Sequence, residues 1–221
     1  MNFPEISNET WTVFCLSLVS TTLGSLWTDH LYSKARKRDS LSFPEQLYER
    51  ARFRKPLLFL SLLVCFYKAW NQFSGPELCY IIVAIFFLLL FTVTDFEQHV
   101  ILDDMLIPFA ALGLCYTLHL NLSVLEHVLA SLGGGLLFLL LAALCKGTLG
   151  GGDIKLIASL GLWLGIKPLG SIIIYGALSG GIAALVLLLA QKSKKNQYMA
   201  YGPYFALSGI GILLKLLLVL F

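Results

Sequence analysis

Residues 80–98 read YIIVAIFFLLLFTVTDFEQ, an apolar run that ends directly in an aspartate, Asp95. The apolar residues follow one another without alternation, which favours a helix buried on all sides over a strand with one wet face. The run holds no charged residue before Asp95, as is typical of a helix that crosses the hydrocarbon core of a bilayer. This stretch therefore predicts a membrane protein.

The composition of the whole chain supports the same fold class. Of the 221 residues, 57% are hydrophobic and 13% are charged, and the mean hydropathy is +0.80. Typical soluble domains are about 25% charged, and a soluble fold with this composition would expose a large apolar surface. The apolar runs are continuous, which excludes the alternating strands of a membrane β-barrel. We therefore predict an all-α, polytopic integral membrane protein.

Eight apolar segments are candidate spans, and three of them are short, so the expected number is six to eight. They are Trp11–Trp27, Pro56–Trp70, Leu78–Thr94, Leu106–Leu120, Val124–Cys145, Ile154–Ile166, Leu169–Ala190 and Pro203–Phe221. The first follows acidic Glu5 and Glu9 and no basic residue, the reverse of a signal peptide, which predicts a retained helix. The five cysteines lack paired spacing and are interpreted as packing residues. They are Cys15, Cys65, Cys79, Cys115 and Cys145.

The lysines and arginines predict which loops face the cytoplasm, where basic residues concentrate. The segment between the first two spans is the most basic. If it is cytoplasmic, 13 of the 16 basic residues fall on that side. The exceptions are Lys68, Lys167 and Lys215. This distribution predicts an external N-terminus and an even number of spans.

Two acidic segments share the predicted cytoplasmic side. Asp95 lies in TDFEQHVILDDM, residues 94–105, and Asp153 lies in GGGDIKL, residues 150–156. Two membrane crossings separate them, so their carboxylates can meet at one depth. Ionisable groups at the bilayer boundary are costly and usually functional. Helix capping is the alternative for Asp153; it explains Asp95 less well, because the dipole at a helix C-terminal end disfavours a carboxylate.

Three glycines, Gly150, Gly151 and Gly152, directly precede Asp153. Glycine permits positive φ and lets another chain approach its backbone closely. A flexible hairpin turn is the alternative interpretation. We expect these glycines to form a surface on which an extended peptide lies.

Two neighbouring carboxyl groups suit acid–base hydrolysis. Repulsion between them keeps a proton on one while the other is ionised. The ionised group activates water, and the protonated group polarises the scissile carbonyl and later protonates the leaving amine. A proton- or cation-coupled transporter is the alternative function. It predicts acids near the bilayer midplane and inverted repeats, and the sequence clearly shows neither.

Three stretches together resemble the bacterial type IV prepilin peptidases, which belong to the GxGD class of aspartic membrane proteases. They are TDFEQHVILDDMLIP (residues 94–108), LGGGDIKLIASLGLWLG (149–165) and YGPYFALSG (201–209). The resemblance covers roughly Phe91 to the C-terminus. It implies that Asp95 and Asp153 are the catalytic pair.

The resemblance also implies a substrate and a location. Family members remove a short basic leader from pilin or pseudopilin precursors at the cytoplasmic face of the bacterial cytoplasmic membrane. Glu97, Asp103 and Asp104 add negative charge near Asp95, and we expect them to attract such a leader. A solvated loop is the alternative for these three. The expected partners are the precursor and membrane lipid, with no nucleic acid.

Two features depart from the family pattern. Residues 30–56 contain no cysteine, which rules out there the four-sulfur zinc site of many members and leaves N-methylation of the product doubtful. S-adenosylmethionine is expected as a cofactor only if that activity is retained, and no metal is expected. Leu102 stands where the family commonly has proline. We divide the chain into residues 1–56, the first span and basic loop, and residues 57–221, the peptidase core.

Overall fold

The computed structural model describes residues 8–37, 41–144, 150–190, 200–217 and 219. Helices are the only regular elements among these residues, which confirms the all-α prediction. In chain order they are α1 (Asn8–Arg36), α2 (Leu47–Arg50), the 3-10 helix η1 (Ala51–Phe53), α3 (Arg54–Gln72), α4 (Gly75–Gln98), α5 (Asp103–His119), α6 (Val124–Leu144), α7 (Gly151–Leu164), α8 (Ile166–Leu189) and α9 (Gly202–Leu213).

Each predicted span overlaps one long helix. Three of the described helices are long and apolar enough to cross a membrane, namely α4, α6 and α8, and α9 is a shorter apolar helix. The total of eight spans stays a prediction. The interpretations that fall on residues 1–7, 145–149 and 191–199, including that of Cys145, lie outside the described residues.

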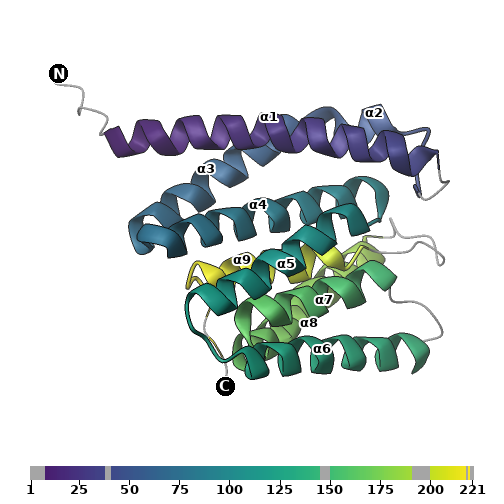
Figure 1. Cartoon of the computed structure of the whole chain (residues 1–221). Coiled ribbons are helices and arrows are strands. Elements are labelled where there is room, and N and C mark those ends of the chain that lie inside the picture. The colour runs from purple at the N-terminus through teal and green to yellow at the C-terminus, as the bar shows by residue number, and fades with distance from the viewer. Residues whose placement is uncertain (1–7, 38–40, 145–149, 191–199, 218, 220–221) are drawn as a thin grey trace.

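The central position of α4 follows from its burial. Just over half of its most apolar window, 56%, is buried inside the protein, against 22% for α6 and 17% for α8. In Figure 1, α1 and α3 lie on one side of α4, and α9, α7, α8 and α6 lie on the other. The outer helices leave many leucine side chains exposed, as lipid-facing surfaces require.

Glycines let several helices approach one another closely. A Cβ at Gly161 would lie 2.5 Å from the backbone nitrogen of Ser131 on α6, and one at Gly176 would lie 2.3 Å from the Phe205 ring on α9. Small residues at such positions allow close helix packing. Gly165 is different: it has φ +77° and ends α7, so it serves the turn into α8.

The last predicted span, Pro203–Phe221, is wrong in its extent. Helix α9 ends at Leu213, and the amides of Leu216 and Leu217 bond back to the carbonyl of Gly211. Lys215 takes a left-handed φ of 52°. The chain therefore turns back after α9 and does not continue as a helix. The Lys215 ammonium then lies 5.1 Å from the centre of the Phe73 ring, within range of a cation–π interaction.

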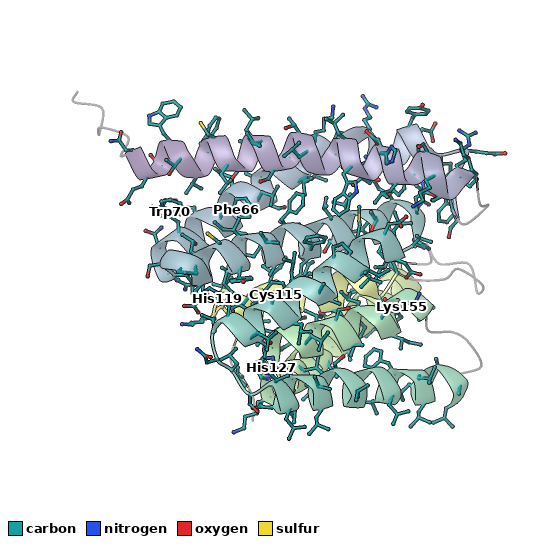
Figure 2. All side chains as sticks on the ribbon, viewed as in Figure 1. Phe66, Trp70, Cys115, His119, His127 and Lys155 are labelled. Carbon is teal, nitrogen blue, oxygen red and sulfur yellow. The ribbon has the colours of Figure 1, made fainter. Side chains whose placement is uncertain are left out.

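One end of the bundle gathers the chemistry predicted above. The C-terminal end of α1, helix α2, the junction of α4 and α5, and the start of α7 lie together (Figure 1). Lys155 marks this end in Figure 2, whereas His119 lies at the opposite end. The acidic and glycine-rich segments therefore converge, as the predicted hairpin topology requires.

Candidate active site

Asp95 lies in the last turn of α4 and is only 5% exposed. The helix ends three residues later at Gln98, where His99 adopts a left-handed conformation and its amide bonds to the Asp95 carbonyl. Among the described residues, Asp95 Oδ2 is the buried side-chain oxygen without a hydrogen bond of ordinary geometry, and the Gly202 backbone is a polar group that interacts with this carboxyl. Burying a carboxylate oxygen without such a bond is costly, which favours a functional explanation for it.

Asp153 lies in the first turn of α7 and is 8% exposed. The N-cap is Gly150, and the Asp153 carboxylate turns back toward its backbone. Asp153 thus occupies the third helical position, from which an acidic side chain can satisfy the start of a helix. Helix capping therefore accounts for part of the role of the Asp153 side chain.

The structure brings these two carboxyl groups together from different hairpins. The charge of Asp153 acts on Asp95, although 57 residues of sequence separate positions 95 and 153. Helix α9 packs against both α4 and α7, and Ile101 lies between Gly202 of α9 and Gly152 of α7. The predicted convergence of the pair is therefore present in the fold.

Gly202, the first residue of α9, closes the space beside Asp95. A Cβ at position 202 would lie 2.6 Å from Asp95 Oδ2 and 2.9 Å from Ile101 Cδ1. The same isoleucine lies 3.0 Å from a Cβ placed on Gly152. Ile101 thus fills the space between the two glycines. The sequence contains Gly202 in YGPYFALSG, but the motif alone assigns it no contact.

The three glycines before Asp153 serve different purposes. Positive φ occurs at Gly75 and Gly165 among the described glycines, so the triplet does not use this conformational freedom in the structure. Gly152 allows the close approach of Ile101, whereas a Cβ on Gly151 would meet nothing within 4 Å. The triplet combines one packed position and one open backbone face.

Glu97 is buried in an ion-pair network and does not point into solvent. Its carboxylate receives hydrogen bonds from Arg54 Nε at 2.8 Å and Nη2 at 2.7 Å, and from the Tyr32 hydroxyl at 3.0 Å. Arg54 also pairs with Asp29. Arg54 and Glu97 are 4% and 6% exposed, so each neutralises the other in a dry environment. A leader could bind Glu97 only by displacing Arg54, and this finding corrects the expectation that Glu97 attracts one.

Asp103 and Asp104 are exposed and link α5 to its neighbours. Lys155 of α7 bonds Asp103 at 2.7 Å, and Lys34 of α1 bonds Asp104 at 2.9 Å. Both pairs line a cavity of about 370 Å³ together with Gly151 and Gly152. Exposed pairs of this kind contribute about 0–1 kcal/mol each, so an incoming cation can exchange with them.

The fold and this site define a class: a helical membrane protein with two buried carboxyl groups at one end of the bundle. Residues 82–185, which contain Asp95 and Asp153, match the model of the type IV leader peptidase family. Over these residues the chain is similar to this family, and named relatives support the same family. No solved structure matches the chain.

Three relatives carry the name prepilin leader peptidase/N-methyltransferase. One from Pectobacterium carotovorum subsp. carotovorum is 31% identical over 62% of this chain and 51% of its own length. One from Neisseria gonorrhoeae is 36% identical over 56% of this chain and 44% of its own length. One from Dickeya chrysanthemi is 29% identical over 85% of this chain and 72% of its own length. In the first two matches the chain spans about half the length of the relative. These relatives give no support to a transporter.

Proposed function

We propose that this protein is a prepilin leader peptidase, an aspartic endopeptidase that removes the basic leader from a type IV pilin or pseudopilin precursor. One observation carries the proposal: the carboxyl groups of Asp95 and Asp153 approach each other from α4 and α7 in a nearly dry site, where the charge of Asp153 acts on Asp95. The family match and the names of the relatives support the same activity.

The chemistry needs one proton shared by the pair. The ionised carboxylate takes a proton from a water molecule, whose oxygen adds to the scissile carbonyl carbon. The protonated carboxyl gives its proton to the carbonyl oxygen, which forms a neutral tetrahedral diol. As the carbon–nitrogen bond breaks, the now protonated carboxyl gives its proton to the departing nitrogen, and the other carboxylate takes a proton from a diol hydroxyl as the carbonyl re-forms, so the pair again holds one proton. Low exposure strengthens these interactions because little bulk water screens them.

The substrate backbone fits beside the glycine triplet. The open face of Gly151 lets an extended peptide approach the main chain, and the cavity of about 370 Å³ continues from it toward Asp103 and Asp104. Leader lysines or arginines would exchange with Lys34 and Lys155 on these two carboxylates. This arrangement retains Asp103 and Asp104 as the proposed leader contacts.

We place the active-site end at the cytoplasmic face of the bacterial inner membrane. The support comes from the distribution of basic residues, because that end carries the basic segment between α1 and α3. N-methylation stays doubtful, since residues 30–56 offer no cysteine for a zinc site. Adding S-adenosylmethionine and looking for a methyl-group mass gain on the product N-terminus tests this point.

The decisive experiment reconstitutes the purified chain in lipid with a candidate prepilin and follows leader removal by gel mobility. Asp95→Asn and Asp153→Asn should each abolish cleavage while the helical circular dichroism and melting temperature persist. Glu126→Gln is the matched control, because Glu126 is an exposed acid at the opposite end of the bundle. Cleavage at a near wild-type rate by either aspartate variant would contradict the assignment.

A further inference from the structure

A second cavity, of about 980 Å³, opens beside the junction of α1 and α3, and neither Asp95 nor Asp153 lines it. Its walls come from the C-terminal part of α1, from α2 and η1, and from the start of α3. Five of its lining side chains are cationic, namely Arg36, Lys37, Arg52, Arg54 and Lys55. Among the lining residues that the structure describes, Asp29 is the one acidic residue.

Most of these cations form no ion pair with the residues that the structure describes. Arg54 is the exception, since Glu97 and Asp29 both pair with it. The ion pairs formed among the described residues do not include Arg36, Lys37, Arg52 or Lys55. In the neighbouring cavity the two lysines, Lys34 and Lys155, are both paired with aspartates. In the described part of the chain, the large cavity therefore carries more positive than negative charge, which favours an anionic ligand.

Exposed leucines are sequence neighbours of residues that line the cavity. Leu57 follows the lining residue Pro56 and is 61% exposed, and Leu26 follows the lining residue Ser25 and is 66% exposed. The lining residue Tyr48, in α2, is 84% exposed. Cations and an aromatic side chain next to exposed leucines mark the boundary between headgroups and acyl chains.

We propose that this cavity binds the phosphate headgroup of an anionic phospholipid. Arg36, Lys37, Arg52 and Lys55 surround the phosphate, and the acyl chains lie along the exposed leucines of α1 and α3. Basic pockets between helices at the cytoplasmic side suit such headgroups. A free phosphate would satisfy the cations but would leave the neighbouring apolar surface unused, so we assign the site to a lipid.

Native mass spectrometry of the full chain in a neutral detergent tests this proposal without any cleavage assay. The probes are phosphatidylglycerol and phosphatidylcholine with identical acyl chains. We expect phosphatidylglycerol to bind at least about tenfold more tightly. The double variant Arg52→Gln/Lys55→Gln should weaken its binding by about 30-fold, because each cation near an anionic surface contributes about a fivefold factor.

Lys68→Gln/Lys167→Gln removes the same charge from the opposite end of the bundle and should change the affinity less than twofold. Equal affinity for both lipids, or equal losses in the two double variants, would overturn the proposal. A third arm uses glycerol phosphate without acyl chains. If it binds as tightly as phosphatidylglycerol, the cavity is a site for soluble anions and the assignment to lipid is wrong.

Discussion

Replacing Gly202 with alanine tests how closely α9 holds the candidate active site. The added Cβ would lie 2.6 Å from Asp95 Oδ2, whereas ordinary contacts of this type begin near 3.4 Å. The carboxylate or the start of α9 must therefore move by roughly 0.8 Å. Ile101 blocks one direction of relief, because its Cδ1 lies 2.9 Å from the same Cβ.

A displacement near 1 Å at a reacting group costs on the order of 100-fold in rate. We expect Gly202→Ala to lower kcat for leader removal by about that factor and to leave the melting temperature within a few degrees of the wild type. Gly181→Ala in α8 is the matched control, because a Cβ there meets nothing within 4 Å. It should cleave at the wild-type rate.

The measurement is prepilin cleavage by the two purified variants in the same lipid, with enzyme concentrations matched by folded protein. A Gly202→Ala rate within threefold of the wild type would show that Asp95 tolerates the shift, and the proposed geometry would then be wrong. Circular dichroism distinguishes a Gly202→Ala variant that fails to fold from one that folds but cleaves slowly. Gly202→Ser, which adds a polar atom beside the same carboxylate, then provides the second measurement.

Four further predictions follow from other contacts. Arg54→Gln leaves Glu97 buried without its cation and should lower the unfolding free energy by about 3–5 kcal/mol in denaturant titrations; no loss would show that the pair is not buried in solution. Gly161→Ala forces α6 away from α7 and should lower the melting temperature, unlike Gly133→Ala, whose Cβ has open space. Asp103→Asn should raise KM for a basic leader with kcat retained, and a change in kcat alone would contradict leader binding there. Burial and the nearby charge of Arg50 lower the pKa of His99, so stability should be complete above the ordinary pKa of about 6.5 and decline below it; His99→Gln should remove part of that decline in melting-temperature profiles against pH.

Hydrophobic runs and charge distribution were sufficient to predict the helices and the convergence of Asp95 with Asp153. Each apolar run is local in sequence, and a hairpin of two crossings must return to the same end of the bundle. The approach of Gly202 to Asp95 was not predictable in this way. It depends on how α9 packs against α4, and no local pattern specifies that contact.

The charged residues near Asp95 show a second limit of prediction from sequence. The sequence places Glu97, Asp103 and Asp104 within ten residues of Asp95, and all three look equally available. In the fold, Glu97 is buried against Arg54, which lies 43 residues away, while the other two remain exposed. Net charge in a segment predicts a potential, but the partner of each group depends on tertiary contacts.

These contacts also explain how the end of α4 is kept in place. The last turn of a helix lacks part of its hydrogen bonding and tends to fray, and Asp95 lies in that turn. Gln98 is clamped to the backbone of Phe43, since its Nε2 donates to the Phe43 carbonyl at 3.2 Å and its Oε1 accepts from the Phe43 amide at 3.0 Å. Glu97 is held by Arg54 at the same end.

The basic segment before α3 therefore does more than orient the chain in the membrane. It supplies Phe43, and Arg54 follows it as the first residue of α3; the two fix the residues that end α4 and, through them, the turn that carries Asp95. The sequence boundary at residue 56 separates the basic loop from the peptidase core, yet the site depends on both sides of it. A core expressed without residues 1–56 would keep both aspartates but lose the contacts that position one of them.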